Sequence, residues 1–248
     1  LVDGTYDQAF ELCLEAAPAF GWYNRNTAYN PYMSEGKKTA AFEICEQLIG
    51  AHGRAPLQAP DVVLVPVGDG CIIGGMYKGF VDLLALGWID RMPRLIGVQA
   101  AGSSPLVDAW QRVRDSSHNL LQAALEMQTI EVNTVADSIS AGLPRDRIKA
   151  LRAVAESDGA YIRVSDDEIL AAIPALARGC GVFAEPAAAA AYAGLVKAVD
   201  DNRVDPDEHI VVLSTGSGLK DVSAAIKSVT WPPIITPDLA DVRRVLGY

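Results

Sequence analysis

The chain has 248 residues, of which 50% are hydrophobic and 21% are charged, as is typical of a soluble globular protein with a sizeable core. Its formal net charge of −10 argues against a nucleic-acid partner, because a protein that binds a phosphate backbone needs a basic surface. The sequence offers no membrane span, since it contains no run of eighteen uninterrupted apolar residues.

The four cysteines (Cys13, Cys45, Cys71 and Cys180) lie far apart in the chain, without a CxxC pair or histidines at ligand spacing. This pattern predicts neither a metal site nor a disulfide framework. No signal peptide is visible at the start of the chain. We therefore expect a reducing, cytoplasmic location.

The chain starts with leucine rather than methionine, on what resembles the end of a strand, and a helix is predicted over residues 6–17. Because a domain rarely begins with the end of a strand, we expect a missing N-terminal segment or a partner chain that supplies it. Residues 21–39 are rich in Asn, Tyr, Gly and Pro and predict a loop. Thr39 is expected to cap a helix that ends near residue 50, and a Pro/Gly/Ala linker follows at 51–60.

Three short apolar runs rich in β-branched residues predict buried parallel strands; they cover residues 61–67, 94–99 and 209–213. Between them, the helical spacing of apolar residues predicts amphipathic helices at about 106–113, 145–155, 166–177 and 187–199. Strands that alternate with helices indicate an α/β fold with an open, mostly parallel sheet flanked by helices.

A glycine cluster from Gly68 to Gly75 (GDGCIIGG) lies between the first strand and a helix. The backbone N–H groups of such a turn, together with the helix N-terminus, form a cradle for an anion such as phosphate. Glycine suits the turn because a side chain would block the approach of the phosphate. The cluster has neither the Lys-Ser/Thr of a Walker A loop nor a clear ribose-binding acid, and its spacing alone leaves a tight turn without a ligand equally open.

A second cluster, from Thr215 to Asp221 (TGSGLKD), follows the third strand. Hydroxyls at a strand end can hydrogen-bond a ring nitrogen or a carboxylate, although in isolation the motif is more typical of a capped strand-to-helix turn. In parallel sheets, ligands bind beyond the carboxyl ends of the strands. The two clusters together therefore suggest one anionic, heteroaromatic ligand held across neighbouring strand ends.

Five segments resemble, in order, the motifs of the threonine synthase family and its relatives among fold-type II pyridoxal-phosphate enzymes. They are NPYMSEGKKTAAFEICEQL, PDVVLVPVGDGCIIGGMYKGF, PRLIGVQAAGSSP, GVFAEPAAAAAYAGL and STGSGLKD, and together they span residues 30–221. The resemblance implies a tryptophan synthase β-like fold. Residues 1–50 would be the remainder of the smaller N-terminal domain with its connecting loop, and residues 51–248 the larger cofactor-binding α/β domain.

The resemblance also implies roles for individual residues toward a pyridoxal 5'-phosphate cofactor. The cofactor phosphate would be bound by the loop residues Gly68, Asp69, Gly70, Cys71, Ile72 and Gly74. Thr215 would hydrogen-bond the pyridine nitrogen, and Asn30 would contact the substrate. Glu185 would be a structural part of its turn rather than a catalytic acid, and no metal is implied.

The first departure from the family pattern concerns the catalytic lysine. The family's Schiff-base lysine lies in an upstream Ser/Thr-x-Lys-Asp-Arg-like segment, and neither that segment nor the Ser/Gly/Asn loop for the substrate carboxylate is found here. We therefore expect the chain to match the C-terminal part of a longer enzyme, to contain no catalytic residue and to be inactive alone.

Two further departures concern the substrate. Threonine synthases usually carry an arginine at the position of Met33, where it helps to hold the substrate phosphate, and methionine cannot pair with a dianion. The usual phosphate loop reads close to GNAGN, whereas GDGCIIGG leans toward the dehydratases and ammonia-lyases of the same superfamily. Asp69 is compatible with a bound phosphate only if its carboxylate points away.

On this resemblance we expect a threonine synthase-like lyase of amino-acid metabolism that converts O-phosphohomoserine to threonine and forms a homodimer. Alternatives in the same fold are a threonine dehydratase, a diaminopropionate ammonia-lyase or a β-replacement enzyme. An alternative of another class is a non-catalytic fragment or subunit that binds a phosphate ligand.

Overall fold

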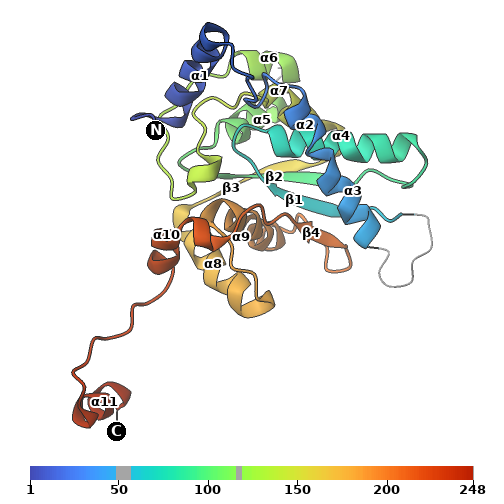
Figure 1. The fold of residues 1–248 in the computed structure, drawn as a ribbon. Helices are drawn as coiled ribbons and strands as arrows, with labels where there is room; N and C mark the ends of the chain where they lie inside the picture. The colour runs from blue at the N-terminus through green and yellow to red at the C-terminus, as the bar shows by residue number, and fades with distance from the viewer. Residues whose placement is uncertain (49–56, 116–118, 248) are drawn as a thin grey trace.

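The computed structural model describes residues 1–48, 57–115 and 119–247, and its core is a four-stranded sheet between two layers of helices (Figure 1). The strands are β1 (Val62–Pro66), β2 (Arg94–Ala100), β3 (Ala160–Val164) and β4 (Ile210–Val212), in the order β3-β2-β1-β4. All three pairings are parallel. The predicted α/β class with a parallel sheet is therefore confirmed.

The central strand β1 is buried on both faces because helices cover both sides of the sheet. Val63 and Val65 face a layer of helices that comprises α3 (Lys38–Gln47), α4 (Cys71–Ala85), α5 (Pro105–Asp115), α6 (Leu120–Leu125) and α7 (Arg147–Glu156). Val62 and Leu64 face α8 (Asp166–Cys180) and α9 (Pro186–Asp200). This two-sided burial explains why the sequence of β1 is continuously apolar rather than alternating.

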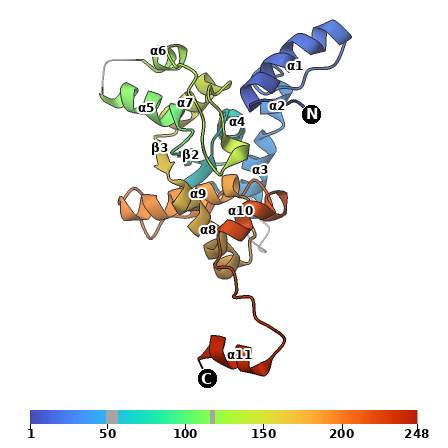
Figure 2. The same cartoon turned by 90° about the vertical axis from the view of Figure 1, so that its left-hand side faces the viewer.

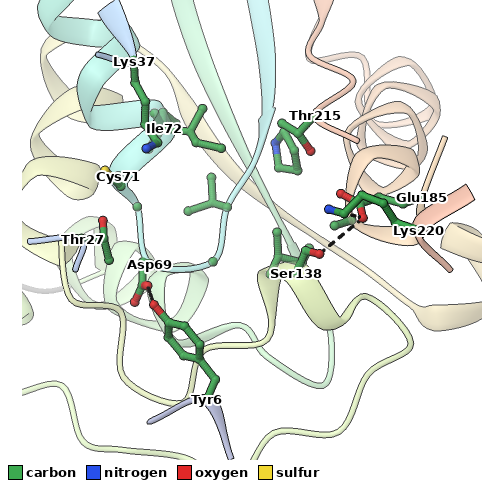
Figure 3. Close-up of a pocket in the computed structure, with 17 residues that line it drawn as sticks. Tyr6, Thr27, Lys37, Asp69, Cys71, Ile72, Ser138, Glu185, Thr215 and Lys220 are labelled. Carbon is green, nitrogen blue, oxygen red and sulfur yellow. Dashed lines mark hydrogen bonds and ion pairs between the residues drawn. The ribbon is translucent and has the colours of Figure 1, made fainter. Parts of the chain in front are cut away.

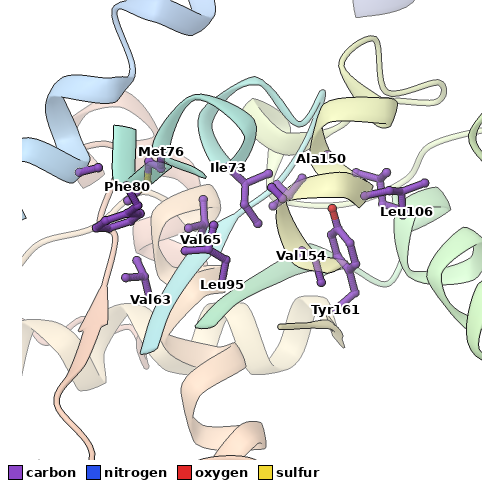
Figure 4. Packing of buried hydrophobic residues seen from close by; sticks show 14 of the residues in the cluster. Val63, Val65, Ile73, Met76, Phe80, Leu95, Leu106, Ala150, Val154 and Tyr161 are labelled. Carbon is purple, nitrogen blue, oxygen red and sulfur yellow. The ribbon is translucent and has the colours of Figure 1, made fainter. Parts of the chain in front are cut away.

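The packing of α4 on the sheet fixes where this helix begins relative to the end of β1. Met76 and Phe80 of α4 lie against Val63 and Val65 of the strand (Figure 4). Both side chains of the helix are 0% exposed. Burial of apolar side chains of this size contributes about 1.5–3 kcal/mol each, so the first turn of α4 is held firmly beside the sheet.

The strand order places a topological switch point between β1 and β4. From β1 the chain runs through α4 to β2, and later to β3 on the far side of β2, whereas β4 returns to the opposite side of β1. At such a point in an open parallel sheet, the connections of the two neighbouring strands lie on opposite faces of the sheet. A crevice therefore opens beyond the carboxyl ends of these two strands. The two glycine clusters of the sequence follow these two neighbouring strands.

The N-terminal helix is longer than predicted, and the predicted loop after it contains a further helix. The helix predicted over 6–17 is α1 (Tyr6–Phe20), which begins with a capping box between Thr5 and Gln8. The predicted loop contains a short helix, α2 (Tyr32–Glu35), immediately before α3. The boundary predicted at residue 50 and most of the predicted linker lie outside the described residues, and the division into two domains stays a prediction.

The prediction that Thr39 caps a helix is wrong. Thr39 lies inside α3, whose N-cap is Lys37, and its hydroxyl donates a hydrogen bond to the Gly36 carbonyl (2.9 Å). The physical reason is that Gly36 and Lys37 already have a helical backbone conformation. Helix α2 therefore leads directly into α3 without an extended capping residue.

The edge strand β3 was not among the predicted strands. Its sequence, AYIRV, is only five residues long and includes the exposed Arg163, so its apolar pattern is weak. Pairing with β2 over five positions supplies the order that the local sequence does not predict.

The chain that follows β4 forms η3 (Gly218–Lys220), α10 (Val222–Lys227) and α11 (Leu239–Leu246). The last helix lies away from the sheet and has no buried residue (Figures 1 and 2). Within the described part of the chain, no helix is long and apolar enough to cross a membrane.

Candidate functional site

A cavity of about 320 Å³ lies beyond the carboxyl ends of β1 and β4, at the switch point of the sheet (Figure 3). Small-molecule sites commonly measure about 300–1,000 Å³. The lining comes from distant parts of the chain and comprises Tyr6, Thr27, Lys37, residues 66–73, Ser138, Ile139, Glu185, Ala187, Thr215 and Lys220. The structure thus brings Gly68, Asp69, Gly70, Cys71, Ile72 and Thr215, which were all predicted from the sequence, into one cavity.

The turn between β1 and α4 has a backbone shape that requires glycine at residue 70. Gly70 has a φ of +91°, and a Cβ atom there would lie 2.5 Å from the Cβ of Ala150. A Cβ atom at Gly68 would lie 3.0 Å from the Cα of Ile139. These glycines are therefore needed for the loop to pack against the protein, which is a different reason from the approach of a ligand that the sequence suggested.

The start of α4 presents backbone N–H groups to the cavity. The first hydrogen bond of the helix runs from the Gly74 N–H to the Gly70 carbonyl (3.1 Å). The N–H groups of residues 70–73 precede this ladder and have no helical carbonyl to bind, which makes the helix N-terminus a site for an anion. Gly74 itself does not line the cavity, and its N–H is used inside the helix.

The carboxylate of Asp69 points out of the cradle. One oxygen accepts a hydrogen bond from the Tyr6 hydroxyl and the other accepts from the Arg145 N–H (3.0 Å), and the Asp69 carbonyl accepts from the Asp146 N–H (2.9 Å). Burial raises the pKa of the Asp69 carboxyl, although the donors from Tyr6 and Arg145 act in the opposite direction. The orientation meets the condition under which an aspartate is compatible with a phosphate in this loop.

Arg145 connects this arrangement to α1. Its guanidinium forms ion pairs with Asp7 (3.0 Å) and Glu11 (2.7 Å) and lies 4.4 Å from the centre of the Phe10 ring. Tyr6 occupies the first turn of the same helix, so this clamp positions the Tyr6 hydroxyl against the loop. Burial and the hydrogen bond to Asp69 raise the pKa of Tyr6 well above its ordinary value.

The wall opposite the glycine turn is polar and carries Thr215 (Figure 3). Glu185, another lining residue, is 4% exposed and pairs with the ammonium of Lys220 (2.9 Å). Its backbone N–H donates to the Gly216 carbonyl (3.0 Å), and the Ser138 hydroxyl, from η2 (Asp137–Ile139), donates to its carboxylate (3.4 Å). Glu185 therefore ties the turn after β4 to the start of α9, and the structural role expected for it stays a prediction.

Asn30 is the one predicted site residue whose side chain lies in a different place. Its amide nitrogen donates to the Tyr23 hydroxyl (2.6 Å) and to the Asn24 carbonyl (3.0 Å), while its oxygen accepts from the Tyr32 N–H (3.0 Å). It lines a separate surface groove with Trp22 and neighbouring residues. In this structure its polar groups serve the loop before α2.

Several of the lining residues have no local signal in the sequence. Thr27 reaches the cavity because its hydroxyl donates to Asp146 (3.0 Å), a carboxylate that also pairs with Lys149 (2.6 Å). Tyr6 and Lys37 lie far from the glycine turn in sequence and join it only through helix packing. Among the residues that the structure describes, no group of His, Cys, Asp or Glu side chains could hold a metal ion.

Comparison with known proteins identifies relatives of the chain. A family model described as pyridoxal-phosphate dependent enzyme matches residues 1–216. The threonine synthase of Methanocaldococcus jannaschii is 38% identical over 245 residues, which are 99% of this chain and 56% of that protein. The threonine synthase of Mycobacterium bovis is also 38% identical, over 99% of this chain and 61% of its own length. The chain thus spans somewhat more than half of the curated relatives that it matches.

Solved structures share the fold at low sequence identity. Diaminopropionate ammonia lyase from Escherichia coli matches 92% of this chain and 57% of its own with a TM-score of 0.66 at 17% identity. Threonine deaminase isoform 2 from Solanum lycopersicum matches 100% of this chain and 58% of its own with a TM-score of 0.64 at 19% identity. These similarities confirm the fold that the sequence motifs imply.

The contact between Tyr6 and Asp69 predicts that a Tyr6→Phe variant binds pyridoxal phosphate several-fold more weakly. The change leaves a partly buried carboxylate oxygen without its donor, which costs about 1–3 kcal/mol, and frees the negative charge to turn toward the phosphate. A fluorescence titration gives the dissociation constant. Adding Asp69→Asn to this variant should recover the affinity, because the amide carries no charge.

Tyr32→Phe is the matched control for this titration. Tyr32 is 74% exposed and does not line the cavity, so its removal should leave the dissociation constant unchanged. Equal affinities for the wild type and Tyr6→Phe would contradict the role assigned to the hydroxyl.

Proposed function

The chain belongs to the pyridoxal-phosphate dependent enzyme family, and we propose that it is the cofactor-binding part of an enzyme that converts O-phosphohomoserine and water into threonine and inorganic phosphate. The observation that carries the proposal is the match to threonine synthases over 99% of the chain, at 38% identity in the two relatives described. The cavity supports it, because its groups suit a phosphorylated heteroaromatic cofactor.

The residues present fit pyridoxal phosphate. We assign its phosphate to the N–H groups of residues 70–72 at the N-terminus of α4, where the helix dipole favours negative charge. The Thr215 hydroxyl, on the opposite wall, is the group that would hydrogen-bond the ring nitrogen. A neutral hydroxyl leaves that nitrogen largely unprotonated. When bound, the cofactor supplies a ring that withdraws electrons from the substrate Cα.

Other residues of the chain hold these groups in place. Asp69 keeps its own charge out of the cradle through Tyr6 and the Arg145 N–H. The ion pair between Glu185 and Lys220 fixes the turn that carries Thr215. In this proposal the chain binds and orients the cofactor, and it does not supply the group that moves the proton at Cα.

We propose further that the lysine that bonds covalently to the cofactor lies in a segment or partner outside this chain. The two lysines that line the cavity, Lys37 and Lys220, lie in other motifs than the family's Ser/Thr-x-Lys-Asp-Arg-like segment. The chain alone would then be inactive, and the complete enzyme, by its family resemblance, a homodimer.

The position of this lysine can be tested by chemical trapping. The chain is mixed with pyridoxal phosphate, reduced with borohydride and mapped by peptide mass spectrometry. We expect no stoichiometric adduct at any lysine, with Lys37 and Lys220 labelled no more than the distant Lys227. A specific adduct at either cavity lysine would overturn the proposal that the catalytic lysine is supplied from elsewhere.

The reaction is tested by incubating O-phosphohomoserine with this chain alone and with a longer protein that also carries the segment proposed to supply the lysine. We expect equal amounts of phosphate and threonine from the longer protein and none above background from the chain alone. Release of ammonia from threonine or 2,3-diaminopropionate, without phosphate release from O-phosphohomoserine, would favour a dehydratase or ammonia-lyase instead. Cofactor binding without turnover of any of these substrates would favour the non-catalytic alternative.

A further inference from the structure

Among the described residues, the charged side chains that line the cavity form one ion pair, and Lys37 and Asp69 stand outside it. Asp69 accepts hydrogen bonds from Tyr6 and from a backbone N–H, and Glu185 pairs with Lys220. The ammonium of Lys37 donates only to the Met33 carbonyl (3.2 Å), and no carboxylate of the described residues lies within ion-pair distance of it. The cavity therefore has a cation that forms no ion pair with a described residue.

The position of Lys37 is fixed by the close packing of α4. A Cβ atom at Gly75 would lie 2.7 Å from the Cβ of Lys37 and 2.7 Å from the Ser34 carbonyl oxygen. Only a glycine at this position lets the start of α3 approach the first turns of α4 so closely. The backbone of residue 37 is thereby held beside the helix N-terminus that forms the cradle.

Lys38, the residue after Lys37, also holds the start of α3 against α4. Lys38 forms ion pairs with Glu35 (2.8 Å) and with Asp82 (2.7 Å) of α4. The hydrogen bonds to these two carboxylates raise the pKa of Lys38. With Lys38 anchored on the outside of α4, the preceding side chain is directed into the cavity, where Figure 3 shows Lys37 running beside Ile72.

Lys37 lies on the opposite side of the turn from Tyr6 and Asp69 (Figure 3). The turn already provides several backbone donors and a helix N-terminus, which suffice for one phosphate. An ammonium on a flexible stem is a point charge that needs no fixed geometry. It can therefore follow an anionic group that lies beside the loop and is not itself held by the backbone donors.

We propose that Lys37 binds the anionic group of the substrate and so selects amino acids whose leaving group is a phosphate ester. The inference rests on the function proposed above, because it places the substrate in the same cavity as the cofactor. Lys37 is a specificity-determining residue in this account, and the chemistry that it recognises is an oxyanion next to the loop rather than the cofactor phosphate inside it.

The test measures binding of inorganic phosphate to the protein held at saturating pyridoxal phosphate, by isothermal titration calorimetry. Lys37→Gln should lose at least about tenfold in phosphate affinity, the size expected for one hydrogen bond to a charged group, and most of its salt dependence. Lys37→Arg should stay close to the wild type, since it restores the charge. Pyridoxal phosphate affinity, titrated separately, should be the same in all three proteins.

The matched control is Lys78→Gln, which removes the same charge from an exposed lysine of α4 that pairs with Glu35 and does not line the cavity. It should bind inorganic phosphate as the wild type does. Equal phosphate affinity in the wild type and Lys37→Gln would overturn the inference, as would an equal loss of pyridoxal phosphate and inorganic phosphate binding. The titration measures phosphate binding and not turnover, so failure of the proposed reaction can be told apart from failure of this inference.

Discussion

The site depends on one constraint, which is that α4 must begin immediately after β1. Met76 and Phe80 are held against the sheet, and only a residue that tolerates a φ of +91°, as Gly70 does, can turn the chain sharply enough between the two elements. The turn places the first N–H groups of the helix, which have no intrahelical carbonyl to bind, at the carboxyl end of a central strand. The anion cradle is therefore a consequence of how strand and helix pack.

The other parts of the site are arranged around the N-terminus of α4. Helix α1 contributes the hydroxyl that keeps the Asp69 carboxylate outside the cradle, and the turn after β4 contributes Thr215 on the opposite wall. That second turn is held by the hydrogen bond from the Glu185 N–H to the Gly216 carbonyl and by the ion pair between the buried Glu185 and the exposed Lys220. Among the described residues, Glu185 and Lys220 pair with each other, whereas the Lys37 ammonium forms no ion pair and donates to the Met33 carbonyl.

Much of this could be predicted from the sequence because it is encoded locally. The apolar run of β1, the glycine turn and the Thr215 turn have local patterns typical of strand ends. The two strands that precede these turns are neighbours in the sheet, as expected for one ligand held across both strand ends. Tyr6, Thr27 and Lys37 could not be predicted, because each reaches the cavity through contacts between helices distant in sequence. The edge strand β3 was missed for a similar reason: pairing with β2, rather than its own residues, makes it a strand.

The most direct test of the central claim is a crystal structure of the protein with pyridoxal phosphate. We expect the cofactor phosphate to accept hydrogen bonds from the backbone N–H groups of residues 70–72, and the ring nitrogen to lie within hydrogen-bond distance of the Thr215 hydroxyl. The Asp69 carboxylate should still be bound to Tyr6. A phosphate bound elsewhere, or a cradle occupied by the Asp69 carboxylate, would contradict the claim.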